Sequence, residues 1–426
     1  MPVAVYVRVS TEEQRERQSI RTQREFADRY CEFHRLAVFR VYADEGISGT
    51  VAMESRPDGS QILRDARAKK FDQLLVYRLD RLGRDTRLWT NSWSTPENRE
   101  RDPVGYALFS EFQPQMTNAN PPDHRRMRAV YEAAFRPAYL ARFGSSIEEE
   151  CRRVLDTIPV ACPFDFMTAF AKVLPGRVSL RMFGLPDEIE SDLARWVEAL
   201  SLIGNIFVTP KQKADAHQAL REFKLFLRGH LKQAEDDGFL AMARASLAEG
   251  IMDEEESLNN LVTLIAGGTA TQTLLGNGLV TLLRHPDQLQ TLRTKPSLME
   301  GAVEEILRYE PGGSFILRVA IRDVELDGMR IPAGAMVLGL MAAINRDPGV
   351  FPDPDSFNIR RFPNPQLVFG AGPHICIGKE VVRMTGRIAF TMLLARFPQI
   401  ALAGEPVWWV HRSDQHGLDK LPVQMN

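Results

Sequence analysis

The sequence has few of the features that would place it in a specialised class of protein. Only four cysteines occur in 426 residues and no two form a C-x-x-C pair, so neither a disulfide framework nor a zinc cluster is indicated. No apolar run is long enough to span a membrane, and the apolar start MPVAVYVRV is too short for a signal-peptide core. The 53 basic and 55 acidic side chains nearly cancel, which gives no whole-chain signal for nucleic acid. We therefore expect a cytoplasmic protein with no membrane partner.

The start of the chain predicts a small parallel sheet. VAVYVRVS alternates strictly, with valines at every second position, which is typical of a strand with one core face. Turn signals and further short patterns follow. The expected order is strand, helix, strand, helix, strand over residues 3–10, 11–30, 37–42, 59–70 and 73–78.

Polar residues at the carboxyl ends of these strands have the chemistry to hold phosphate. Ser10 ends the first strand, and LDRLGR places Arg81 and Arg84 three residues apart on a helix that begins near Asp80. Guanidinium groups match phosphate oxygens and stabilise developing charge. On residue types alone, an exposed serine beside a solvated basic helix is the commoner explanation of the same pattern.

The order of YVRVST, DEGISG, RPDGSQILRDAR and VYRLDRLGR resembles the catalytic domain of the serine recombinases, the resolvase/invertase family. The resemblance implies a serine nucleophile for DNA, phosphate-binding arginines and an active-site acid. These residues are Arg8, Ser10, Asp80, Arg81 and Arg84. The resemblance stops after residue 87, and nothing further along resembles the family's dimerisation helix or DNA-binding module. It predicts a truncated recombinase domain over 1–87, with DNA as a partner only if this remnant functions.

A second motif, FGAGPHICIG, lies just ahead of a helix that we expect to begin near Lys379. Its glycines allow a sharp turn and a close approach to a flat ligand. Its lone cysteine, Cys376, arrives at a helix N-terminus, where the helix dipole favours a thiolate, and a thiolate is a ligand of haem iron. The alternative is a buried structural cysteine, which is the commoner fate of a lone cysteine.

A long apolar helix is predicted from about Ser257 to Arg284, with Gly267 and Gly268 in its interior. Two glycines cost a helix roughly 1.6–2 kcal/mol relative to alanine, so a close-packed flat ligand or a local kink is indicated. Two pairs at helical spacing, Glu305 with Arg308 and His124 with Arg128, complete the candidate residues. Taken alone, such a pair is an ordinary helix contact worth about 0.2–0.5 kcal/mol.

Together these motifs resemble the cytochrome P-450 family, the haem-thiolate monooxygenases, over most of residues 100–426. The resemblance implies haem b as cofactor, with Cys376 as the proximal iron ligand and the Glu305–Arg308 pair as a structural support of the cysteine loop. The remaining residues that it places at the cofactor or its propionates are His124, Arg128, Gly267, Arg318, Phe369, Gly370, His374 and Gly378.

The oxygen-binding helix departs from the family pattern, which reads Ala/Gly-Gly-x-acid-Thr-Thr before Gly-Asn-Gly. Counting back from the Gly-Asn-Gly at 276–278 places Thr269 at the acid position and Ala270 at the usual threonine, with Thr271 one residue beyond. An alternative register makes Thr271 the catalytic alcohol but breaks the spacing. We favour the first register, in which the usual acid–alcohol pair is missing.

The predicted architecture is a mainly α cytochrome P-450-type fold over 88–426, truncated at its N-terminus and preceded by a small α/β resolvase-like fragment. The predicted function is insertion of one oxygen atom of O2 into a small or mid-sized apolar substrate. Electrons would come from a ferredoxin and a ferredoxin reductase, since the chain has no flavin or iron–sulfur motif. The alternatives are a DNA-binding or strand-exchange recombinase and a non-functional gene fusion.

Overall fold

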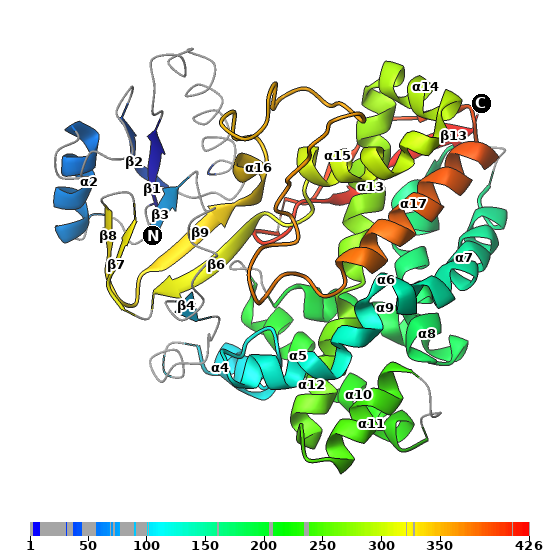
Figure 1. Cartoon of the computed structure of the whole chain (residues 1–426), viewed down its shortest axis with the longest axis horizontal. Coiled ribbons are helices and arrows are strands. Elements are labelled where there is room, and N and C mark those ends of the chain that lie inside the picture. Colours follow the sequence, from blue (N-terminus) through cyan, green and yellow to red (C-terminus); the bar gives the residue numbers. More distant parts are fainter. Residues whose placement is uncertain are drawn as a thin grey trace. The chain divides into compact units, whose positions relative to one another are not determined.

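A computed structural model of the chain divides it into two compact units (Figure 1). The residues that the structure describes are 3–8, 31, 37–44, 57–68, 70, 73–76, 89–90, 100, 102–159, 162–203, 208–233, 238–320, 322–326, 329–410 and 412–425. The first unit contains Met1–Asn91, Gly313–Ser356 and Gly370–Ile375. The second contains Ser92–Gly312, Phe357–Phe369 and Cys376–Asn426. Among the described residues, no helix has the length and apolar character needed to cross a membrane.

The first unit is built on a six-stranded sheet with the order β2-β1-β3-β9-β6-β4. Its strands are β1 (Val3–Arg8), β2 (Val38–Asp44), β3 (Gln73–Val76), β4 (Trp89–Thr90), β6 (Phe315–Ala320) and β9 (Met336–Leu340). The strand β1 runs parallel to both β2 and β3. This unit also contains a hairpin of β7 (Val324–Leu326) and β8 (Met329–Ile331) and the short helix α16 (Met341–Ile344).

The strands β1, β2 and β3 overlap the predicted ranges 3–10, 37–42 and 73–78, and the second predicted helix is present as α2 (Pro57–Arg67). A buried hydrogen bond joins α2 to β2, because the Tyr42 hydroxyl donates to Asp65 Oδ2 at 2.7 Å. The predicted helix over 11–30 lies outside the described residues, so the complete strand–helix alternation stays a prediction. The sheet also continues beyond the third predicted strand, because β3 pairs with β9.

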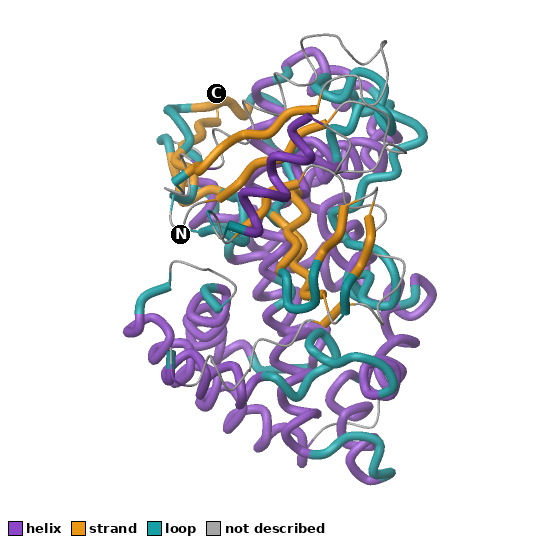
Figure 2. Tube along the Cα trace, turned by 90° about the vertical axis from the view of Figure 1, so that its left-hand side faces the viewer, coloured by secondary structure: helices purple, strands orange, loops and turns teal. Residues whose placement is uncertain are grey.

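The second unit consists mainly of helices and has several short strands. Figure 2 shows the helices and strands of the chain in different colours. Its longer helices are α4 (Pro103–Phe112), α5 (Asp123–Glu132), α7 (Gly144–Asp156), α8 (Val173–Phe183), α9 (Glu190–Ser201), α10 (Pro210–Gln233), α11 (Phe239–Ala248), α12 (Glu254–Ala266), α13 (Thr269–Arg284), α14 (Pro286–Thr294), α15 (Met299–Tyr309) and α17 (Lys379–Arg396). The described strands are β5 (Phe164–Asp165), β10 (Ile400–Leu402), β11 (Val407–Trp408), β12 (Leu418–Lys420) and β13 (Pro422–Met425). Leu258, Leu261, Val262 and Ile265 show the helical spacing that builds its core, since all four are buried on one face of α12.

The single long helix predicted from Ser257 to Arg284 is wrong in one respect, because the structure divides it into α12 and α13 at the glycine pair. The backbone there tightens: the N–H groups of Gly268, Ala270 and Thr271 each donate to the carbonyl three residues earlier. A Cβ atom on Gly268 would lie 2.8 Å from Ser179 Oγ of α8. The glycines therefore accommodate both a change of helix geometry and a close neighbour, in keeping with the kink considered from the sequence.

Candidate functional site

The cysteine motif forms a closed loop immediately before α17. The N–H of Cys376 donates to the carbonyl of Phe369 at 2.8 Å, which joins the two ends of the loop. Gly370 and Gly372 have φ values of +72° and +78°, a region that favours glycine. The motif's glycines thus serve the turn itself, and the helix begins at Lys379 as predicted.

The electrostatic surroundings of the Cys376 sulfur combine burial with positive charge. Burial raises the pKa of the thiol, whereas the N–H of Gly378 and the cations Arg128, Lys379 and Arg383 lower it. Burial therefore opposes the thiolate that the helix N-terminus was expected to favour, and burial has the larger effect on the pKa here. A metal cation at the sulfur favours the thiolate form, so this cysteine fits a haem iron.

Arg383 links three segments around the loop. Its guanidinium lies over the Phe369 ring, 4.8 Å from the ring centroid, and its Nε donates to Glu304 of α15 at 2.6 Å. Gln366 Nε2 donates to the same carboxylate at 3.1 Å. Phe369, the first residue of the loop, therefore packs against Arg383 of α17. Its position beside the thiolate stays what the resemblance implies.

Glu305 and Arg308 of α15 form the centre of a buried network, and both side chains are 0% exposed. Glu305 accepts two hydrogen bonds from Arg308, each at 2.8 Å. It also accepts from Arg361 Nε at 3.1 Å, Asn364 Nδ2 at 3.1 Å and the Asn358 N–H at 2.9 Å. The spacing alone predicted an ordinary helix ion pair. The structure shows that Glu305 and Arg308 also hold the segment ahead of the cysteine loop through these hydrogen bonds. Sequence reasoning missed Arg361, Asn364 and Arg383, because they reach Glu304 and Glu305 from more than fifty positions away in the chain and follow no local spacing.

His124 and Arg128 lie four residues apart on α5, as the helical spacing predicts. His124 is buried, and burial followed by the charges of Arg128 and Arg125 lowers its pKa, so a neutral imidazole is favoured. The next arginine, Arg126, anchors the helix by donating to both Glu256 oxygens of α12, at 2.8 and 2.6 Å. The structure therefore places Arg128 within the electrostatic reach of Cys376 on an anchored helix.

Three predicted cofactor residues belong to the first unit, namely Arg318, Gly370 and His374. Arg318 lies on β6 opposite Val337 of β9, and its Nη1 donates to the Leu317 carbonyl at 2.7 Å. Burial lowers the pKa of its guanidinium. A Cβ atom on Gly370 would lie 3.7 Å from Ile316 Cδ1 of the same strand, so the loop and β6 are in contact within this unit.

Comparison with known proteins gives a consistent result. The family model described as Cytochrome P-450 matches residues 92–408. The biotin biosynthesis cytochrome P-450 of Bacillus subtilis (strain 168) is 35% identical over 327 residues, which cover 75% of this chain and 82% of that protein. The solved structure of CxnD, a cytochrome P-450 for C–S bond formation in chuangxinmycin biosynthesis, aligns with a TM-score of 0.75 and 32% identity, covering 82% of this chain and 86% of that one.

The chain belongs to the cytochrome P-450 family. It is accordingly an oxidoreductase of the monooxygenase type, and the family implies a haem cofactor. A further solved structure, P450BioI in complex with an acyl carrier protein ligated to hexadec-9Z-enoic acid, aligns with a TM-score of 0.74 and 31% identity, covering 80% of this chain and 89% of that one.

The oxygen-binding helix of this P-450 presents different residues on different faces. Gly267 and Ala270, three residues apart, are exposed, whereas Thr271 is 3% exposed. The exposed face therefore carries a methyl group at position 270, and the neighbouring hydroxyl of Thr271 is buried. The register in which Ala270 occupies the position of the usual threonine stays a prediction. The backbone of Thr269 begins α13.

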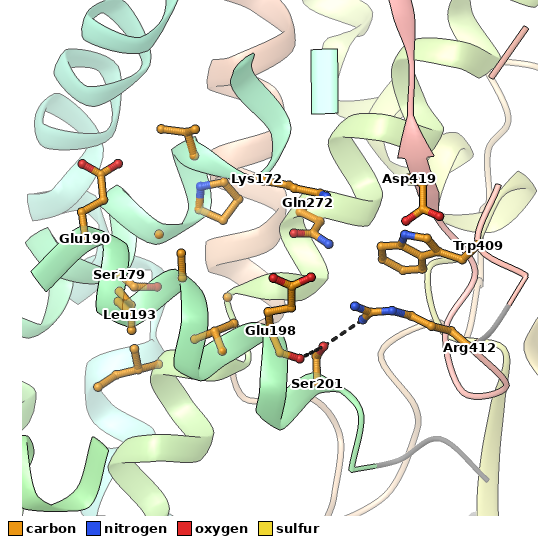
Figure 3. Close-up of a pocket in the computed structure, with 17 residues that line it drawn as sticks. Lys172, Ser179, Glu190, Leu193, Glu198, Ser201, Gln272, Trp409, Arg412 and Asp419 are labelled. Carbon is orange, nitrogen blue, oxygen red and sulfur yellow. Dashed lines mark hydrogen bonds between the residues drawn. The ribbon is translucent and has the colours of Figure 1, made fainter. Parts of the chain in front are cut away.

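A cavity of about 210 Å³ lies against another face of the same helix pair, lined by Gly268 and Gln272 and by residues of α9 (Figure 3). Gln272 and Glu198 point into it, and Arg412 donates to Ser201 Oγ at 2.9 Å across its lower side. This volume is below the range of about 300–1,000 Å³ that is usual for small-molecule ligands. The cavity therefore suits water or a small polar molecule better than a mid-sized apolar substrate.

The N-terminal segment is similar to a different family from the rest of the chain. The family model described as Resolvase, N terminal domain matches residues 3–100. Of the predicted recombinase residues, Arg8 ends β1 in register with Asp44. The others, Ser10, Asp80, Arg81 and Arg84, lie outside the described residues, so their assignment remains a prediction.

Proposed function

We propose that the protein is a haem b-dependent monooxygenase that inserts one oxygen atom of O2 into a small or mid-sized apolar molecule, with electrons from a ferredoxin and a ferredoxin reductase. The observation that carries this proposal is the Cys376 loop, which combines a buried sulfur, a hydrogen bond from Gly378 and nearby cations. The fatty acyl group named for the acyl-carrier-protein complex of a related P-450 supports an apolar substrate. The recombinase alternative has a family match over residues 3–100, but Arg8 is its one candidate among the residues that the structure describes.

Each residue has a defined part in this proposal. Cys376 would supply the thiolate that holds the iron, and the Gly378 N–H donates to its sulfur. Phe369 would lie beside this thiolate. By the family resemblance, His124, Arg128, Arg318 and His374 would bind the haem propionates. Glu305 with Arg308 keeps the chain ahead of the loop in place. The bound haem would supply O2 activation and electron transfer.

The test is a carbon-monoxide difference spectrum of the purified, reduced protein. The shift typical of thiolate-ligated haem is expected for the unaltered chain and for Cys162→Ala, a control at an exposed cysteine. It should be lost in Cys376→Ala, because that change removes the ligand. Well-folded protein that binds no haem would overturn the proposal.

Proton handling at the distal side is proposed to differ from the family pattern, because position 270 has no hydroxyl and position 269 has no acid. With hexadec-9-enoic acid as trial substrate, Ala270→Thr should increase the product formed per reductant consumed. Thr271→Val is the matched control and should leave this ratio nearly unchanged, since the Thr271 side chain is buried. A loss of coupling in Thr271→Val with no gain in Ala270→Thr would favour the alternative register.

A further inference from the structure

The sheet of the first unit joins strands from the two families. Strands β1 and β2 and the central strand β3 lie within the part that matches the resolvase family, residues 3–100. Strands β6 and β9 lie within the part that matches the P-450 family, residues 92–408. One join is between β3 and β9, which run parallel with Leu75 opposite Leu338 and Val76 opposite Gly339. The two-residue strand β4, also within residues 3–100, makes a second by pairing with β6. A continuous backbone ladder therefore crosses from one sequence family to the other.

The position of β3 in the sheet makes this join structurally important. The strand has β1 on one side and β9 on the other, so it is an interior strand. Without β3, one side of β9 would present unpaired N–H and C=O groups, and such an edge recruits other strands or aggregates. Val337 and Leu340 of β9 are only 6% and 3% exposed, so the strand that would lose its neighbour belongs to the core.

The strand β9 in turn holds β6. These two strands pair antiparallel from Phe315 opposite Leu340 to Val319 opposite Met336, and this ladder includes Arg318 opposite Val337. The order β1-β3-β9-β6 therefore connects the resolvase-like segment to the strand that carries Arg318. The connection is made through backbone pairing and does not involve recombinase chemistry.

We propose that the resolvase-like segment is a structural part of the oxygenase: β3 covers the edge of β9 and thereby supports the strand that bears Arg318. This role depends on Gln73–Val76 and is independent of Ser10. This structural role is separate from the proposed monooxygenase activity. It assigns a function to a segment that matches the resolvase family and not the cytochrome P-450 family. The role of Arg318 in binding haem rests on the proposed function, whereas the pairing of β3 with β9 does not.

A disulfide trap tests the register in the full chain. In a Cys162→Ser background, Leu75→Cys is combined either with Leu338→Cys or with Met336→Cys, two residues along the same face of β9. Paired strands are about 4.8 Å apart and rise about 3.3 Å per residue, so the Cα separations are about 5 Å and about 8 Å. Only the first lies within the limit of about 7 Å for a disulfide. At least tenfold more cross-link is expected for the Leu338→Cys pair. Equal yields, or none in either pair, would overturn the proposal.

Amide hydrogen exchange tests the support given to β9. Leu75→Pro disturbs the interior strand, whereas Val38→Pro alters the first residue of the outer strand β2, where proline is tolerated. Exchange in residues 336–340 should accelerate at least tenfold in Leu75→Pro and remain unchanged in Val38→Pro, with α17 as an internal reference. Unaltered exchange of β9 in Leu75→Pro would refute the proposed support. If that variant does not fold, the cross-linking result decides alone.

Neither measurement requires bound haem. A failed cross-link beside a normal carbon-monoxide spectrum would therefore reject the strand pairing and leave the monooxygenase proposal intact. A successful cross-link in a protein that gives no thiolate-type carbon-monoxide spectrum would instead support the strand pairing and reject the monooxygenase proposal.

Discussion

Replacement of Glu305 by glutamine should destabilise the second unit far more than the spacing of Glu305 and Arg308 would suggest. The carboxylate is 0% exposed and accepts from Arg308, Arg361, Asn364 and the Asn358 N–H. Glutamine keeps the shape but leaves the fully buried Arg308 guanidinium without its counter-charge. Breaking a buried pair in this way costs about 3–5 kcal/mol. At about 2–4 °C per kcal/mol for a large domain, the melting temperature should fall by roughly 6–20 °C.

The assay is thermal unfolding followed by far-ultraviolet circular dichroism, with Glu304→Gln as the matched control. Glu304 is the adjacent residue on α15 and pairs with Arg383, but both side chains are partly exposed. Such a pair contributes about 0–1 kcal/mol, so the control should shift the melting temperature by only a few degrees. If the two variants melt together, the buried network does not carry the stability assigned to it. Arg308→Gln combined with Glu305→Gln should cost less than the sum of the single changes, because the two residues share one network.

Two further predictions concern the helices around the site. Gly268→Ala should destabilise the protein by about 1–3 kcal/mol in urea unfolding, because the new methyl group would lie 2.8 Å from Ser179 Oγ. Adding Ser179→Ala should restore most of the lost stability. If it restores none, this contact is not the cause. The hydrogen bonds from Arg126 hold the pKa of Glu256 below its ordinary value. The pair therefore stabilises the folded state at pH values above the ordinary carboxyl pKa. This contribution is lost as the pH falls through the lower pKa of the folded state. The decrease in urea midpoint between about pH 7 and about pH 3 should therefore be smaller in Glu256→Gln than in the unaltered chain, and an equal decrease would show that the pair has no part in acid sensitivity.

Much of the local structure followed from short-range rules. Alternating valines predicted β1, the motif around Cys376 predicted a glycine-dependent turn before α17, and helical spacing placed His124 and Arg128 on one helix. These features depend on residues close together in the chain. Their backbone preferences and periodicity can be recognised without knowledge of the tertiary contacts. The predicted domain boundary after residue 87 stays a prediction, because the two family models overlap between residues 92 and 100.

Other features required contacts between distant segments. The break at Gly267–Gly268 depends on α8 packing closely against the helix, and the strength of the Glu305 network depends on residues more than fifty positions away in the chain. The pKa of the Cys376 thiol shows the same limit. Its position ahead of a helix predicted stabilisation of the thiolate, but burial by the surrounding chain acts in the opposite direction and outweighs it.

The sequence by itself determined which chemistry the protein carries, because the cysteine loop, the paired charges and the altered oxygen-binding helix are local motifs with recognisable spacing. It also showed that two families meet in one chain. Only the tertiary structure decided how they are joined: β3 and β9 are separated by more than 250 residues, and their pairing follows no local pattern. A strand's sequence specifies which side chains point to each face, whereas its neighbour is chosen by backbone groups that every residue shares.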